Sequence, residues 1–287
     1  MELGHGIEMG ILHTVNLLLK LASLPVFTEA GGGSFEPPAI DHEFSPPALL
    51  FAGTPFELNR ILLIRLISAF VILILMMWYA KRAKLVPGRG QAIIESIMDI
   101  SRVQIADEVI GKEAAKAYQP MLMTIFMGVF FMNITGIIPG LQIAGTSLIG
   151  MPLIYAIFAY IGFIVAGIKA RGLHFFIEQL APKGVPWWLY IIMVPIEFLS
   201  NFILRPVTLT FRLFMNMIAG HLILVLCFVG THFLYFTLSG VLGGVFGTLT
   251  FVAGVAFVCF EIMVGALQAY IFAMLSAAYI SLSISEH

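Results

Sequence analysis

The chain has 287 residues, of which 60% are hydrophobic and only 11% are charged. Soluble domains carry about 25% charged residues, so this composition excludes an ordinary soluble domain and indicates an integral membrane protein. The net charge of −1 gives no indication of nucleic-acid binding, and we expect none. The two cysteines, Cys227 and Cys259, lie in apolar segments and are interpreted as small core residues.

Residues 1–57 are predicted to form an outer N-terminal segment. Its apolar run, ILHTVNLLLKLASLPVF, follows Glu2 and Glu8 and lacks the basic start of a secretory signal. The run also contains polar residues, so it is interpreted as an interfacial helix. A loop rich in Gly and Pro follows it.

Residues 58–287 are predicted to form a single, all-α membrane domain. Runs of about twenty apolar residues are long enough to cross the hydrocarbon core as helices. The five predicted spans cover about 58–80, 120–141, 148–168, 189–230 and 243–284.

Basic residues set the predicted orientation, because Lys and Arg near span ends stay in the cytoplasm. Lys20 and Arg60 are the basic residues up to the start of the first span, against seven acidic residues. Seven basic residues separate the first and second spans, and three follow the third span. We therefore expect the N-terminus outside and, with five spans, the C-terminus in the cytoplasm.

The segment between the first two spans, about 91–117, has a different pattern. Its apolar residues recur at helical spacing with charged residues between them. This pattern predicts an amphipathic helix on the cytoplasmic membrane surface.

The fourth and fifth apolar stretches are longer than an upright span requires. Residues 189–230 would make a helix of about 63 Å, against a hydrocarbon core of about 30 Å. Either the helices tilt steeply, or Pro195 and Pro206 divide the fourth stretch. Because the piece 189–204 is marginal as a full span, long and steeply tilted helices are favoured.

Polar groups interrupt these two stretches. Ionisable groups at membrane depth cost about 2.5–3.5 kcal/mol on insertion scales and usually mark an ion path. The alternative, that each group only holds two helices together, stays open. The residues concerned are Glu197, Arg205, Arg212, Asn216, His221, Glu261 and Gln268, with His232 interpreted as interfacial.

An antiparallel pairing of the two stretches would arrange these groups in layers. In such a pair, residue numbers rise along one helix while they fall along the other. Two residues at the same membrane depth, one on each helix, therefore have residue numbers that always add up to about the same value. Arg212 and Gln268 share one layer, and His221 and Glu261 share another nearer the outside. At 3.6 residues per turn, Asn216 lies on the side of Arg212, whereas His221 points roughly the opposite way. This separation suits an ion path better than an internal salt bridge.

Small residues on the last stretch form a ridge at Gly265, Ala269, Ala273 and Ser276, which permits close helix approach. The sequence leaves open whether the ridge packs within the chain or faces a partner.

Catalytic and nucleotide-binding motifs are absent from the sequence. It contains no phosphate-binding Gly-rich loop, no His-Glu-x-x-His site and no nucleophile elbow. We therefore expect no cofactor, no metal site and no catalytic residues; the expected chemistry is the movement of charge.

Two sequence stretches resemble a known family. RPVTLTFRLFMNMIAGHL (205–222) and EIMVGALQAYIF (261–272) are similar to the signature of subunit a of the F-type (H⁺-transporting) ATP synthases. FMNITGIIPG (131–140) resembles the end of that family's second span, which marks Asn133 and Pro139 as structural residues.

This resemblance implies a non-catalytic stator subunit in a bacterial plasma membrane. Two offset aqueous half-channels would carry protons to and from carboxylates on a ring of small proteolipid rotor subunits (c-type). Further implied partners are a peripheral-stalk membrane subunit (b-type), the membrane lipid and, indirectly, the soluble ATPase head.

The resemblance also assigns roles to residues. Arg212 matches the essential arginine, Asn216 and Gln268 match the nearby amides, and His221 and Glu261 match the outer half-channel pair, in the order of mitochondrial-like members. Met215 stands where a small residue is usual.

The inner half-channel match is weaker. Its candidates are Glu197, Arg205 and Thr208, but the spacing from Glu197 to Arg205 is one residue longer than in the family.

Two other classes remain as alternatives. A self-contained proton-coupled secondary transporter often carries an inverted repeat, and none is visible between the halves. An intramembrane enzyme is disfavoured by the missing catalytic spacings.

Overall fold

The structure is a computed structural model that describes residues 48–50, 58–82, 84, 88–138, 143–172, 174–180, 189–237 and 240–284. The predicted N-terminal interfacial helix, its Gly/Pro-rich loop and Pro139 lie outside these residues. Within the described residues the chain divides into two compact units, one made of residues 222–259 and the other of residues 48–221 with 260–284.

Five helices are long and apolar enough to cross a membrane, which confirms the predicted all-α membrane fold. They are α4 (Arg60–Arg82), α7 (Lys112–Ile134), α8 (Gly150–Arg171), a helical stretch from Tyr190 to Phe236, and α12 (Val241–Ile284). The described residues also contain a short antiparallel pair, β1 (Ala48–Leu50) with β2 (Leu58–Asn59), which precedes α4.

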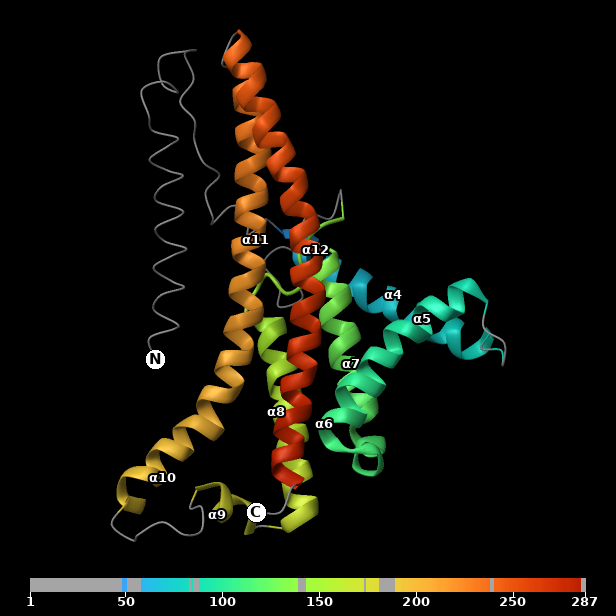
Figure 1. Cartoon of the computed structure of the whole chain (residues 1–287), viewed down its shortest axis with the longest axis vertical. Helices are drawn as coiled ribbons and strands as arrows, with labels where there is room; N and C mark the ends of the chain where they lie inside the picture. Colours follow the sequence, from blue (N-terminus) through green and yellow to red (C-terminus); the bar gives the residue numbers. More distant parts are fainter. Residues whose placement is uncertain are drawn as a thin grey trace. The chain divides into compact units, whose positions relative to one another are not determined.

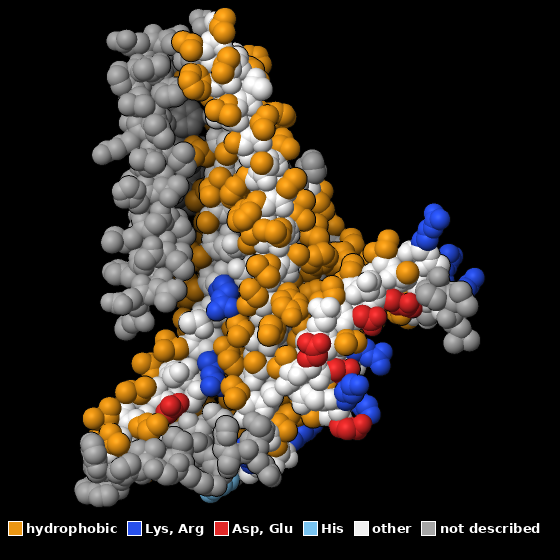
Figure 2. Space-filling model, viewed as in Figure 1, with side chains coloured by type: hydrophobic (Ala, Val, Ile, Leu, Met, Phe, Trp, Pro, Cys, Tyr) orange, Lys and Arg blue, Asp and Glu red, His pale blue; other side chains and the backbone are white. Residues whose placement is uncertain are grey.

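The predicted surface helix is built from α5 (Arg89–Asp99), the π-helical segment η1 (Ile100–Asp107) and α6 (Glu108–Ile110). It ends earlier than predicted because Gly111 has a φ of 92°, a backbone conformation that favours glycine and stops the helix. Consequently α7 begins at Lys112, eight residues before the predicted second span. In Figure 1, α5 runs obliquely to α7, and Figure 2 shows charged side chains gathered over this part of the molecule.

The core of the larger unit joins α7, α8 and the C-terminal part of α12. Gly162 of α8 faces the side chain of Met121 in α7, where a Cβ would clash. The Asn133 side chain of α7 donates a hydrogen bond from Nδ2 to the carbonyl of Gly265 in α12, at 3.1 Å. Close approach of helices therefore depends on small residues here.

The small-residue ridge of α12 belongs to this core. Ala269, Ala273 and Ser276 each have 0% exposure, and Gly265 is also buried. The structure thus decides the question that the sequence left open, because the ridge packs within the chain.

The fourth span keeps a helical backbone through both prolines. It consists of α10 (Tyr190–Phe198), the π-helical segment η3 (Leu199–Leu204) and α11 (Arg205–Phe236). Pro206 is the second residue of α11, directly after η3, and the helical backbone continues through it. The favoured prediction of one long helix, rather than two separate spans, is therefore confirmed.

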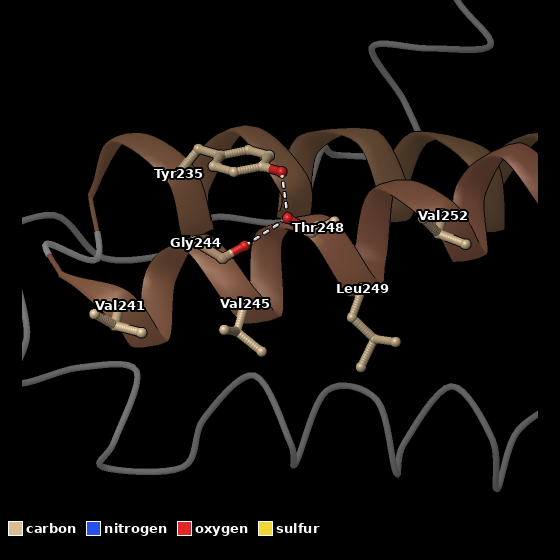
Figure 3. Close-up of a pocket in the computed structure, with 7 residues that line it drawn as sticks. All are labelled: Tyr235, Val241, Gly244, Val245, Thr248, Leu249 and Val252. Atoms are coloured by element: carbon tan, nitrogen blue, oxygen red, sulfur yellow. Dashed lines mark hydrogen bonds between the residues drawn. The ribbon is translucent and has the colours of Figure 1, made fainter.

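In the smaller unit, residues 222–259 form an antiparallel helical hairpin. Thr231 Oγ1 donates to Thr250 Oγ1 at 3.3 Å, and the hydroxyls of Tyr235 and Thr248 are 2.8 Å apart. Figure 3 shows the Tyr235–Thr248 contact above an open apolar hollow lined by valine and leucine side chains of α12. In both pairs the two residue numbers add up to nearly the same value as in the predicted layers, as expected for two antiparallel helices.

Candidate functional site

Arg212 lies on an exposed face of α11. Leu213 and Met217 point the other way and are buried, with 0% and 2% exposure. Phe211 and Met215 share the exposed face, with 44% and 51% exposure. Arg212 itself is exposed and forms no hydrogen bond or ion pair with any residue that the structure describes. The helix therefore presents a permanent positive charge on an apolar, outward-facing surface.

Met215, which stands where the resemblance leads us to expect a small residue, lies beside this charge. It follows Arg212 by three positions, so the two side chains are neighbours on one face of the helix. A methionine is unbranched and adapts to irregular surfaces. Its exposure shows that it does not fill the core of this chain.

Glu261 is buried against α11. Its side chain is 6% exposed, and Oε2 has no hydrogen-bond partner among the described residues. A Cβ on Gly220 would lie 2.7 Å from Glu261 Oε1, so only glycine leaves room for the carboxylate there. Gly220 immediately precedes His221, which is half-buried. The fold thus places the Glu261 carboxylate at the α11–α12 contact, against the residue that precedes His221.

Asn216 and Gln268, the two amides of the predicted deeper layer, are both half-buried. Asn216 follows Arg212 by one helical turn, and Gln268 follows Glu261 by two turns, so each lies on the same side of its helix as that partner. Neither amide forms a hydrogen bond with the residues that the structure describes. Both retain donors and acceptors for water or a partner protein.

Arg205 occupies a different environment from Arg212. Its guanidinium carbon lies 5.5 Å from the ring centre of Phe163 and 4.9 Å from that of Tyr279, which are cation–π distances. These rings belong to α8 and α12. Nη1 is buried and has no hydrogen-bond partner in the described part of the chain. Arg205 therefore holds a charge inside the helix bundle.

Glu197 and Thr208 flank Arg205 along the same span. Glu197 is half-buried and interacts electrostatically with Arg205. The Thr208 hydroxyl is exposed and donates to backbone carbonyls of its own helix, those of Leu204 at 2.8 Å and Arg205 at 3.0 Å. Thr208 thus has its hydroxyl proton engaged by its own helix, whereas Glu197 lies within electrostatic range of Arg205 without a direct ion pair to it.

Asn201 is a polar residue that the sequence reasoning missed. Its side chain is 4% exposed and donates from Nδ2 to Glu197 Oε2 at 2.9 Å. The same nitrogen donates to the carbonyl of Gln179 in α9 (His174–Leu180), at 3.1 Å. The available signal was its position, four residues from both Glu197 and Arg205.

Asn133 holds three parts of the larger unit together. Besides its bond to Gly265, its Oδ1 accepts a hydrogen bond from Thr146 Oγ1 at 2.7 Å. The adjacent carbonyl of Gly145 accepts a hydrogen bond from Arg65 Nε of α4, at 2.9 Å. The side chain thus links α7 to α12 and to the connection before α8.

No cluster of three or more His, Cys, Asp or Glu side chains suited to a metal lies in the described ranges.

These features define a multi-pass membrane protein with ionisable side chains inside its last two spans, an arrangement typical of ion-translocating proteins. Comparison with known proteins gives the family. The ATP synthase A chain family matches residues 62–281, and the chain belongs to it.

Curated relatives agree with this assignment. The chain is 42% identical to ATP synthase subunit a of Rhodococcus erythropolis over 272 residues, covering 94% of this chain and 98% of the relative. It is 38% identical to ATP synthase subunit a of Paenarthrobacter aurescens over 248 residues, covering 86% and 92% of the two chains. With that of Frankia alni the identity is 36% over 267 residues, covering 91% and 89%. The protein is thus a membrane component with a role in proton transport and ATP synthesis.

Proposed function

We propose that this chain is the stator that carries protons through two offset half-channels to and from a rotor ring of small proteolipid subunits. The exposed charge of Arg212 on an apolar face is the observation that carries the proposal. A guanidinium stays protonated, and leaving it uncompensated at membrane depth is costly. A carboxylate on a passing ring subunit would compensate this charge.

The exposed face of α11 is the proposed surface that meets the ring. Phe211, Arg212 and Met215 supply it with apolar side chains around one charge. A rotor must slide past this face without locking onto it, and an unbranched methionine tolerates changing neighbours.

The proposed outer half-channel leads to His221 and Glu261. A proton entering from outside would reach this pair and pass to a ring carboxylate. Once neutral, the ring carboxylate can rotate into the lipid at lower cost. The close fit of Glu261 against Gly220 supports this role by holding the carboxylate at the helix contact.

The proposed inner half-channel runs along Glu197, Arg205 and Thr208 towards the cytoplasm. A positive charge within about 4–6 Å lowers the pKa of a carboxylate by about 1–3 units, so Arg212 favours proton release from the arriving ring site. Because arginine does not give up its proton, it also prevents direct passage between the half-channels. Each charge moved across the membrane supplies about 2.3 kcal/mol per 100 mV.

The proposed topology follows from the distribution of basic residues. The N-terminus lies outside, and the C-terminus lies in the cytoplasm of a bacterial cell. The proposed partners are the proteolipid ring, a peripheral-stalk membrane subunit, the surrounding lipid and, indirectly, the soluble ATPase head. ATP synthesis itself would take place on that head.

Replacement of Arg212 tests the proposal. In inverted membrane vesicles, Arg212→Ala should abolish ATP-driven proton pumping, measured by quenching of a pH-sensitive dye, while the complex still assembles. Lys116→Ala is the matched control, because it removes an exposed cation whose ion pair with Glu113 is also exposed. Normal pumping by Arg212→Ala would refute the proposal. Proton transport by the purified chain without a ring would instead favour a self-contained transporter.

A further inference from the structure

Three polar side chains of the fourth span form a row, Glu197, Asn201 and Arg205, spaced four residues apart. Asn201 is the buried centre of this row. Its side-chain NH₂ group has two protons to donate, and the structure uses both, one on Glu197 Oε2 and one on the carbonyl of Gln179.

The row depends on the π-helical segment η3. In an uninterrupted α-helix, residues eight positions apart differ by about 80° in direction. A π-helical turn closes between residues i and i+5, so it contains an additional residue and rotates less per residue. Leu199–Leu204 has this geometry, which turns Glu197 towards the face of Arg205. Their electrostatic interaction agrees with this placement.

The two ends of the row are held differently. The aromatic rings of Phe163 and Tyr279 fix the guanidinium of Arg205 from two other helices. Glu197 has one carboxylate oxygen, Oε2, held by Asn201. Its other oxygen, Oε1, accepts no hydrogen bond from the described residues and is therefore available to water or a proton.

We propose that Asn201 is a positioning residue that orients the Glu197 carboxylate for proton release on the inner side, with η3 setting the register. An amide does not titrate in the physiological range, so it orients the carboxylate without competing for the proton. The bond to Gln179 anchors the amide on α9 and prevents it from turning away. This inference rests on the proposed function, in which Glu197 belongs to the inner half-channel.

A double-mutant cycle tests the proposal. The intact complex is assembled in membrane vesicles, the soluble head is removed, and passive proton conduction through the membrane sector is measured. Asn201→Leu should lower conduction about tenfold, as expected for loss of a hydrogen bond to a charged group. In a Glu197→Gln background, the same change should have no further effect, because the two residues act as one unit. Asn201→Gln, which keeps the donor, should restore most of the conduction.

Two further variants keep the test decisive. Ser200→Ala is the matched control in the same π-helical segment, and it should leave conduction unchanged. If Asn201→Leu fails to assemble, Asn201→Ala replaces it, since alanine removes the hydrogen-bond donor without adding bulk or a titratable group. Full conduction by the Leu or Ala variant would overturn the proposal, and so would equal losses with and without Glu197, which indicate a purely structural role.

The outcome for Arg212 separates this inference from the proposed function. If Arg212→Ala abolishes pumping while Glu197→Gln conducts normally, only the inference about Asn201 fails. If Arg212→Ala pumps normally, the proposed function fails as well.

Discussion

Two arginines seven residues apart in α11 have opposite surroundings. Arg212 is exposed and has no partner among the described residues, whereas Arg205 is half-buried between the rings of Phe163 and Tyr279. Both carry the same charge, so the difference lies in what the neighbouring helices offer. A charge that the chain already accommodates stabilises or tunes its surroundings. A charge that the chain leaves exposed at membrane depth requires a partner from outside.

The largest expected difference between the two sites comes from replacing each arginine by lysine. Arg212→Lys should abolish coupled ATP synthesis, because a lysine in a desolvated site can release its proton and no longer separates the half-channels. Arg205→Lys should keep at least half of the activity, since an ammonium group also binds aromatic faces. ATP synthesis in energised vesicles measures both. An equal loss of ATP synthesis in both variants would contradict the proposed difference in role between Arg212 and Arg205.

The second prediction concerns the space around Glu261. Gly220→Ala should lower proton pumping at least tenfold, because the new methyl group forces the carboxylate out of position at a cost of about 1–3 kcal/mol. Gly230→Ala is the matched control in the same helix, where a Cβ meets nothing within 4 Å. It should pump normally. Normal pumping by Gly220→Ala would show that the carboxylate position is not critical.

A third, smaller effect is expected from shortening the π-helical segment. Deleting the exposed Ile203 should convert η3 to an α-helix and leave Glu197 and Arg205 seven residues apart, which is again nearly one face. Pumping should therefore fall less than twofold. Deleting Val207, within α11, rotates Arg212 by about 100° relative to Arg205 and should abolish pumping. Loss of pumping in both deletions would contradict the register role of η3.

The smallest effect is expected at Thr208. Thr208→Val keeps the shape of the side chain and removes a hydroxyl group whose proton is engaged by the backbone of its own helix. Because the helix persists and the proposed inner path loses only one oxygen that could accept a hydrogen bond from water, pumping should fall less than twofold. A severalfold loss would show that this oxygen is a main contributor to the inner path.

The sequence by itself determined the number of spans and the polar residues within the last two. Length and hydropathy are enough to find spans because the hydrocarbon core fixes how many apolar residues a helix needs. Once an antiparallel pairing of the last two spans is assumed, residue numbers alone place His221 at the level of Glu261, and the contact of Gly220 with Glu261 agrees with that layer.

The tertiary structure alone decided which helix faces are covered. In a helix of a soluble protein, polar residues mark the exposed side. Because α12 is apolar on nearly every face, the periodicity of its sequence does not distinguish a face covered by lipid from a face covered by protein. Only packing shows that the ridge at Ala269 is internal and that Met215 faces outward. The same holds for Asn201, whose two bonds depend on a π-helical segment and on the approach of α9, which apolar periodicity does not reveal.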